Sequence, residues 1–173
     1  MRTIKQLTNY KYLNIKEVSD PENHVKGFQF AERRGVDSVA FICYDRDSEQ
    51  FLLNREYKVP NNKMVLGAFG GSFDKTNDPL YVVINEVKEE AGFIVDHHNI
   101  VYLGKVLVST QMNQYCWLYI VFVNKDKQVE REPENEIEKM AKIEWHLWDN
   151  EIYKLEDWKP ITIIAMADAQ DII

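Results

Sequence analysis

One stretch constrains the fold more than any other: the pair Gly70-Gly71, then a helical pattern, then a further glycine. Asp78-Pro79 predicts the start of the helix, because proline fits the first turn and an acidic residue favours the positive end of the helix dipole. Gly92 predicts its end, since glycine tolerates the left-handed conformation. Apolar residues recur every four positions in between, which predicts a stripe that faces a core. The stripe consists of Val83, Val87 and Ala91.

Three glutamates, Glu86, Glu89 and Glu90, share another face of this helix, because they are spaced by three and four residues. Their carboxylates repel one another unless a cation lies among them. Oxygen-only ligands at this density suit Mg²⁺ or Mn²⁺ rather than zinc. The helix alone leaves a second interpretation open, namely an acidic face that is simply exposed to solvent.

The composition of the 173-residue chain fits one globular domain and narrows its partners. A net charge of −7 argues against sequence-independent binding of nucleic acid. No apolar run approaches the roughly 20 residues that span a membrane, and no apolar segment of a signal peptide follows Met1. Cys43 and Cys116 lie in apolar runs, which is typical of reduced, buried thiols. We therefore expect a cytoplasmic protein without a membrane partner.

The remaining apolar patterns predict strands on both sides of the helix. They cover residues 9–18, 25–32, 36–44, 50–54, 64–66, 93–95, 100–108, 115–123 and 143–148. Residues 55–62 are predicted to be a loop. Asp149 is a candidate cap for a short helix to Leu155, and 160–172 favours a terminal helix. Strands around one central helix, with a second helix at the end, predict an α/β sandwich with a mixed sheet.

The stretch from Gly71 to Phe93 resembles the Nudix hydrolase signature over 23 positions. The glycine, the glutamates and the closing glycine are in register. Asn77 stands where the signature has its first glutamate, and Asn85 where it has an arginine that helps to hold the metal-binding glutamates. The resemblance implies an α/β/α Nudix sandwich with a bound Mg²⁺ or Mn²⁺. It implies as metal ligands Glu86, Glu89, Glu90 and the backbone carbonyl of Gly70.

The flanking segments resemble the ADP-ribose pyrophosphatase branch of that family. Residues 55–60 stand where this branch has its basic and aromatic Gln/Glu-Tyr-Arg-X-Pro segment, although 109–114 lack the Pro-Gly often found later in the chain. The branch has an N-terminal β extension that pairs subunits. The resemblance thus implies a homodimer, with an extension over 1–35 for dimerisation or substrate contact and a Nudix domain over 36–173.

The implied activity is metal-dependent hydrolysis of a diphosphate linkage in a nucleoside diphosphate derivative similar to ADP-ribose. In the implied reaction, water attacks phosphorus. The resemblance also implies that Glu89 is a catalytic residue. In this branch a glutamate of the loop before the last strand often acts as the base. Glu134, Glu136 and Glu138 are the candidates here, and we favour Glu136.

Arg33, Arg55 and Tyr57 are the candidates for substrate contact, because they are basic or aromatic residues close to the resembling segments. For Arg33, a position that is simply exposed to solvent is an equally open interpretation. Two alternatives stay open. A binding or regulatory module with weakened catalysis is suggested by Asn77 and Asn85. A Nudix enzyme acting on nucleoside triphosphates or capped RNA is the other, although the acidic net charge disfavours long RNA.

Overall fold

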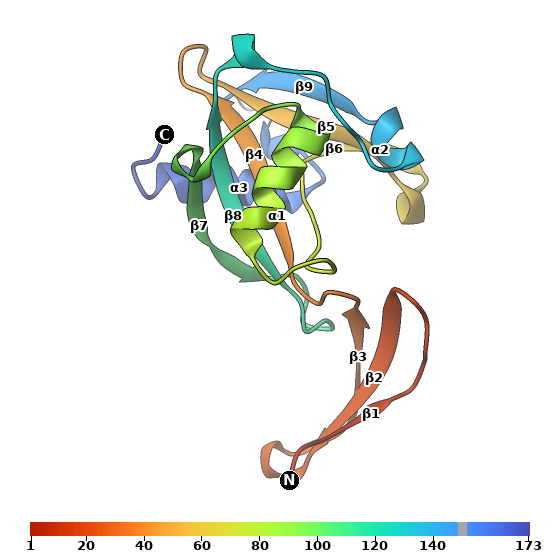
Figure 1. Ribbon diagram of the computed structural model, residues 1–173. Helices are drawn as coiled ribbons and strands as arrows, with labels where there is room; N and C mark the ends of the chain where they lie inside the picture. Colours follow the sequence, from red (N-terminus) through yellow and green to blue (C-terminus); the bar gives the residue numbers. More distant parts are fainter. Residues whose placement is uncertain (149–151) are drawn as a thin grey trace.

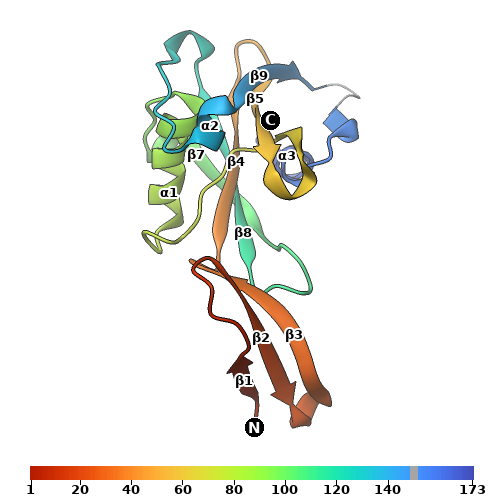
Figure 2. The same cartoon turned by 90° about the vertical axis from the view of Figure 1, so that its right-hand side faces the viewer.

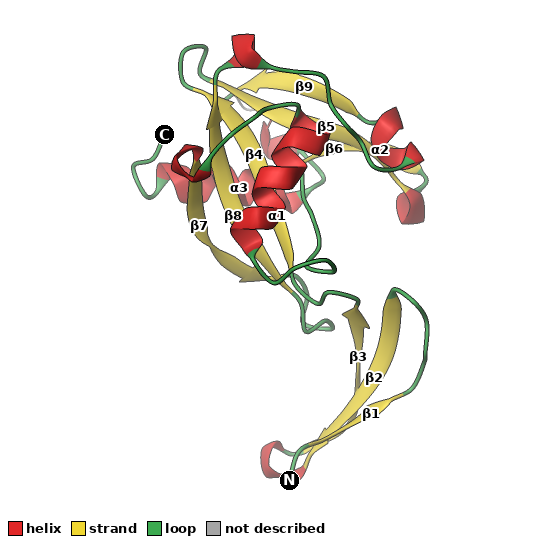
Figure 3. Ribbon diagram, in the orientation of Figure 1, coloured by secondary structure: helices red, strands yellow, loops and turns green. Residues whose placement is uncertain are grey.

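A computed structural model describes residues 1–148 and 152–173 of the chain. Two separate sheets and three α-helices make up the described part, as Figure 3 shows. The main body is a mixed sheet between helices, which confirms the predicted α/β sandwich. Within the described residues, no helix combines the length and apolar character needed to cross a membrane.

The N-terminal strands form a three-stranded antiparallel sheet that projects from the body (Figures 1 and 2). Its strands are β1 (Thr3–Gln6), β2 (Leu13–Asp20) and β3 (Val25–Arg33). Val18 is the one buried apolar residue in this fully described sheet, and the other apolar side chains are partly or largely exposed. The sheet joins the body where the Ala31 amide donates to the Gln111 carbonyl at 2.8 Å.

The main sheet has six strands, in the order β6-β5-β4-β8-β7 with β9 also paired to β5. β4 and β8 run parallel and the other pairs are antiparallel, so the sheet is mixed. The strands are β4 (Ser38–Asp45), β5 (Gln50–Lys58), β6 (Lys63–Gly67), β7 (Ile100–Leu107), β8 (Tyr115–Val123) and β9 (Lys142–Leu147).

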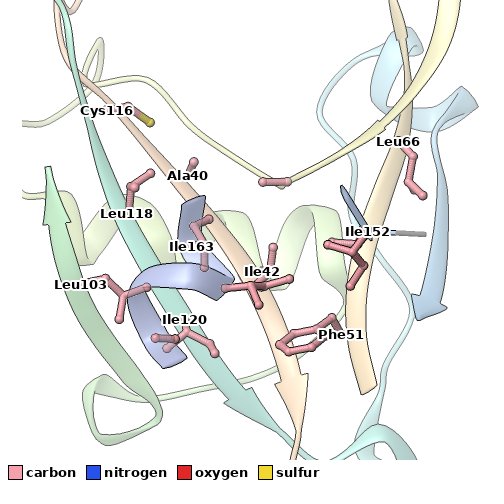
Figure 4. Close-up of a cluster of buried hydrophobic side chains, with 14 residues drawn as sticks. Ala40, Ile42, Phe51, Leu66, Leu103, Cys116, Leu118, Ile120, Ile152 and Ile163 are labelled. Atoms are coloured by element: carbon pink, nitrogen blue, oxygen red, sulfur yellow. The ribbon is translucent and has the colours of Figure 1, made fainter. Parts of the chain in front are cut away.

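Helices cover both faces of this sheet: α1 (Pro79–Glu86) lies on one face and α3 (Trp158–Asp168) on the other. Each helix contributes to its own buried apolar cluster. The cluster beneath α3 is drawn in Figure 4 and includes Ile163, which is fully buried. Burying one such side chain stabilises the fold by about 1.5–3 kcal/mol. The third helix, α2 (Glu136–Met140), is a single short turn before β9.

The predicted central helix is present with its predicted ends. The Asp78 side chain accepts hydrogen bonds from the backbone amides of Leu80 (3.0 Å) and Tyr81 (3.3 Å). The helix continues past α1 as a π-helical turn, Val87–Ala91, and stops at Gly92 with φ of 75°. A π-helical turn inserts one extra residue, and such turns are rare and frequently lie at functional sites. The predicted apolar stripe is fully buried.

Some local predictions were wrong. Residues 55–58 are not a loop but the second half of β5, because they pair with β6 in a hairpin that joins Lys58 to Lys63. Residues 93–95 form no strand, and β1 was not predicted. The terminal helix begins before Pro160 and ends at Asp168. The proposed cap at Asp149 lies outside the described residues.

Candidate functional site

The glycine loop between β6 and α1 lies against the centre of the main sheet. The amide of Val39 on β4 donates to the carbonyl of Gly71 at 2.9 Å, and Phe69 exchanges two backbone hydrogen bonds with Phe41 at 3.0 Å each. A Cβ atom on Gly70 would stand 2.6 Å from the Val39 carbonyl oxygen, closer than real Cβ contacts come. Glycine at this position therefore lets the loop press onto β4.

Two of the three glutamates converge on this loop. A Cβ atom on Gly71 would stand 2.3 Å from Oε1 of Glu86, so the carboxylate lies directly over the glycine. The Gly70 amide donates to Oε2 of Glu90 at 3.3 Å, and this glutamate is only 8% exposed. Glu89 is half-buried on the neighbouring turn. The helix therefore supplies the carboxylates, and the backbone of the loop is the surface on which two of them lie.

The electrostatics of the cluster favour protonation in the absence of a cation. Burial, followed by repulsion from Glu90 and Glu89, raises the pKa of Glu86 to about 8. Burial also raises the pKa of Glu90 to about 8, although the hydrogen bond from Gly70 acts in the opposite direction. The pKa of Glu89 is raised by burial and then by Glu134. Nearby positive charge would relieve these costs.

The donor set of the three glutamates and the Gly70 carbonyl fits a hard divalent cation, since every candidate ligand atom is oxygen. Among the described residues, one group of three potential metal-binding side chains has all its donor atoms within 4.8 Å of one another. This group is the exposed turn of Asp96, His97 and His98, and it does not include the glutamates. The carboxylate oxygens of the three glutamates do not all lie within 4.8 Å of one another. Such spacing fits carboxylates that repel one another.

Two cavities meet at the glycine loop. The first, called here the acidic cavity, has a volume of about 310 Å³ and includes Glu86, Glu89 and Asn85 in its walls. The second, called the mixed cavity, has a volume of about 350 Å³ and carries both acidic and basic side chains. Both cavities share the walls Gly70, Gly71, Ser72 and Glu138.

Of the three predicted substrate-contact residues, one lines a cavity at the glycine loop and two do not. Arg33 lines the mixed cavity, and its guanidinium donates a hydrogen bond to the Ser72 hydroxyl. Arg55 lies elsewhere and forms a two-point ion pair with Glu144. The Tyr57 hydroxyl donates to Oδ1 of Asn62 at 2.6 Å, and Tyr57 lines neither cavity.

The reason is the alternation of side chains along β5. Successive residues of a strand point to opposite faces, so a shift of one position moves a side chain across the sheet. Glu56 and Lys58 line the mixed cavity, whereas Arg55 and Tyr57 do not. Sequence reasoning missed the first two because it treated this segment as a loop. The polar residues of 55–58 show no apolar alternation that could have identified this half of the strand from the sequence.

The acidic segment before β9 places two of its three candidate glutamates in the cavity walls and the third away from them. Asn135 caps α2 by accepting from the amides of Ile137 and Glu138. Glu138 then lines both cavities. Glu136, favoured from the sequence as the base, has a side chain that is 86% exposed and pairs with Lys139 at 2.7 Å. Glu134 lines the acidic cavity and pairs with Lys75 at 2.6 Å.

The two positions that depart from the signature do not brace each other directly. Asn85 is half-buried in the wall of the acidic cavity, and Asn77 is exposed. In the part of the chain that the structure describes, no hydrogen bond joins their side chains. Lys75 is the cation in the acidic cavity wall, and its charge lowers the pKa of Glu89 against the larger effect of burial.

Comparison with known proteins places the chain in a family. A model of the NUDIX domain matches residues 35–164, which is most of the chain. The chain therefore belongs to the Nudix family and is a Nudix hydrolase. Its fold is similar to that of a solved ADP compounds hydrolase, with a TM-score of 0.71 at 16% sequence identity, over 99% of this chain and 95% of that one. No curated protein matches the sequence.

Proposed function

We propose that the protein hydrolyses the diphosphate linkage of a nucleoside diphosphate joined to a second small moiety, with Mg²⁺ or Mn²⁺ as cofactor. The convergence of Glu86 and Glu90 on the Gly70-Gly71 loop, where two cavities meet, carries this proposal. ADP-ribose is the model substrate, supported by the sequence resemblance and by the fold shared with an ADP compounds hydrolase.

Glu86, Glu89, Glu90 and the Gly70 carbonyl would hold the cation. A divalent cation bound there neutralises the negative charge of the diphosphate and helps to make water nucleophilic. The chain places these groups on a capped helix and on a loop fixed to β4, so their positions are set by the fold. Preorganised groups of this kind avoid reorganisation during the reaction.

Glu138 is the better candidate for the general base, in place of the predicted Glu136. It lies in the wall shared by the two cavities, and the Glu134 amide donates to its Oε2 at 2.7 Å, which orients the carboxylate. In the proposed step, this carboxylate accepts a proton from the attacking water. The water oxygen bonds to phosphorus, the anhydride P–O bond breaks, and each product carries a phosphate.

Lys58 and Arg33 are proposed to bind phosphate oxygens of the substrate. Both side chains line the mixed cavity next to Glu90. Lys58 is held by an ion pair with Glu56, and Arg33 by its hydrogen bond to Ser72. Charge-assisted hydrogen bonds from such groups are stronger than neutral ones.

The N-terminal extension, residues 1–35, is proposed to pair subunits in a homodimer. Its projecting sheet exposes large apolar side chains, and an exposed apolar surface of this kind is typical of an interface. The exposed residues include Ile4, Tyr10, Tyr12, Leu13 and Phe28. Measurement of the mass in solution tests this proposal, and a monomeric mass at working concentration would remove it.

The test of the proposed function is a substrate panel with Mg²⁺ or Mn²⁺. The panel contains ADP-ribose, dinucleotides, nucleotide sugars, nucleoside triphosphates and a capped oligonucleotide. We expect turnover of at least one diphosphate-linked compound and its loss when the cation is chelated. Nucleotide binding without any turnover would instead support the binding module that Asn77 and Asn85 suggest. Preferred turnover of triphosphates or caps would reassign the substrate.

A further inference from the structure

The mixed cavity contains a basic residue that the proposed mechanism does not use. Lys159, in the first turn of α3, lines this cavity together with Arg33 and Lys58. These residues come from three distant parts of the chain, and only the folded protein brings them together. A volume of about 350 Å³ is within the range of about 300–1,000 Å³ for small-molecule sites.

The ammonium group of Lys159 is paired with the carboxylate of Asp157, which backbone amides hold in place. Asp157 is 8% exposed at its side chain, and it accepts hydrogen bonds from the amides of Ala68 (3.3 Å) and Lys159 (3.1 Å). The Lys159 Nζ atom lies 3.7 Å from Asp157 Oδ2. Asp157 does not line the cavity, whereas the lysine does. The ammonium group is therefore positioned by Asp157 and presented to the cavity.

The charge of Arg33 is not neutralised by a carboxylate among the described residues. Its side-chain hydrogen bond goes to a neutral hydroxyl, that of Ser72. Lys58, in contrast, is paired with Glu56. Of the other two acidic residues in the wall, Glu90 faces the glycine loop, and Glu138 is shared with the acidic cavity. Arg33 and Lys159 are thus the two cations of this wall that are not paired with a carboxylate lining the cavity.

The positive charges of Arg33 and Lys159 act at the same place. Burial raises the pKa of the Cys116 thiol, and the charge of Asp157 adds to this effect, while a hydrogen bond with Ser38 and the charges of Lys159 and Arg33 lower it. Cys116 lines the cavity and lies at one end of the core cluster beneath α3, as Figure 4 shows. Arg33, Lys159 and Cys116 thus line one cavity, and both cations lie close enough to the thiol to affect its pKa.

The rest of the wall suits a hydroxylated moiety rather than a base. Gln114 is 4% exposed and donates to the Ser38 hydroxyl at 3.0 Å, and both residues line the cavity. None of the described residues in this wall is aromatic, so the wall offers no ring on which a nucleobase could stack. Amide and hydroxyl groups beside cations are instead partners for a sugar that carries a charge.

We infer that the mixed cavity binds the moiety attached to the nucleoside diphosphate, and that Lys159 with Arg33 selects a carboxylate or phosphate on that moiety. This inference rests on the proposed function. The preferred substrates are then nucleoside diphosphates joined to an anionic sugar. Lys159 is a residue that determines specificity, and the glutamate cluster performs the hydrolysis.

Matched substrate pairs test the selection. UDP-glucuronate and UDP-glucose differ by one carboxylate, and ADP-ribose 1″-phosphate and ADP-ribose differ by one phosphate. We expect kcat/KM to be about tenfold or more higher for the anionic member of at least one pair, as a charge-assisted contact predicts. The two pairs show whether carboxylate or phosphate is preferred. Equal kcat/KM within both pairs would overturn the inference and leave the hydrolytic function standing.

Variants then connect the preference to Lys159. In Lys159→Met the backbone amide that binds Asp157 remains, and we expect the preference for the anionic member to fall about tenfold, with partial recovery in Lys159→Arg. Lys127→Met is the matched control, because this exposed lysine lies beyond the other end of β8, roughly 25 Å from Cys116 by strand length. A preference that Lys159→Met leaves intact would contradict the assignment.

A binding measurement separates this inference from the proposed function. Glucuronate 1-phosphate and glucose 1-phosphate are titrated calorimetrically into the metal-free protein and into Lys159→Met. Tighter binding of glucuronate 1-phosphate by the wild type, lost in the variant, supports the subsite even if no pair is hydrolysed. Absence of turnover alone would overturn the hydrolytic function, whereas equal affinity for both sugar phosphates would overturn the subsite.

Discussion

The carboxylate of Glu86 lies over the backbone of Gly71, where a Cβ atom would stand 2.3 Å from its Oε1. Gly71 is not among the glycines with positive φ, so its backbone conformation does not require glycine. Glycine is needed here for space, because a Cβ atom would occupy the room that the Glu86 carboxylate takes. Gly71 also lines both cavities. The space that it leaves sets the position of a candidate metal ligand, Glu86.

Gly71→Ala is expected to lower kcat/KM about 100-fold, because the added methyl group displaces Glu86, and small misplacements at a reacting site cost about that much. The melting temperature should also fall, because the same methyl group would stand 2.6 Å from Cγ1 of the buried Val82. Steady-state kinetics and thermal unfolding of the same preparations measure both. Unchanged kinetics would show that Glu86 does not need this position.

The metal-free protein should lose stability as the pH rises. Glu86 and Glu90 have pKa values raised to about 8 from 4.5, so the folded state binds their protons more tightly than the unfolded state does. This contribution is fully present below pH 4.5 and is lost as the pH rises through about 8. We expect the melting temperature to fall by a few degrees in this window, since about 1 kcal/mol corresponds to roughly 2–4 °C at this chain size.

Two further melting curves control this prediction. Glu90→Gln cannot ionise and should weaken the pH dependence. Added Mg²⁺ should restore stability most strongly at pH 8 and above, where the carboxylates are free of protons. A metal-free protein whose stability rises between pH 5 and pH 8 would contradict the uncompensated cluster.

Glu138→Gln should lower kcat by about 10²–10⁴-fold, the typical contribution of general acid–base catalysis. Glu136→Gln, two residues away on an exposed position, should change kcat less than twofold. If the Glu136 variant proves to be the impaired one, the original sequence-based assignment is restored.

Lys58→Met should raise KM about tenfold, because a phosphate contact is lost, while Tyr57→Phe should leave KM unchanged. The two residues are adjacent on β5 but point to opposite faces, and only Lys58 lines the mixed cavity. Initial-rate kinetics with the best substrate of the panel decide the matter. A larger effect from Tyr57 would mean that the substrate approaches the other face.

The parts of the fold with local causes were predictable. The central helix starts at a capping aspartate and ends at a glycine with positive φ, and both signals lie within its own sequence. The second half of β5 was not predictable in the same way. Its strand character depends on pairing with β6, and the pattern Arg55-Glu56-Tyr57-Lys58 contains polar residues at every position that faces the mixed cavity.

The residues of the candidate site also fall into two groups, those with a local sequence signal and those whose position depends on the fold. The spacing of Glu86, Glu89 and Glu90 predicted that they share one face of a helix, and the resemblance to the Nudix signature then made them candidate ligands. The choice between Glu136 and Glu138 depends on where Asn135 begins α2, which shifts which side chain faces the cavities. Lys159 could not be found from sequence, since it reaches the cavity from a helix packed on the opposite face of the sheet.

The central claim is that water attacks a diphosphate under the control of the glutamate cluster, and one measurement tests it most directly. ADP-ribose, or the best substrate of the panel, is incubated with Mg²⁺ in H₂¹⁸O, and the products are analysed by ³¹P NMR and mass spectrometry for the wild type and Glu90→Gln. We predict two phosphate-bearing products, ¹⁸O in the phosphate of one of them, and a rate at least about 100-fold lower in the variant. Equal rates for both proteins, or products without ¹⁸O in a phosphate, would contradict the account.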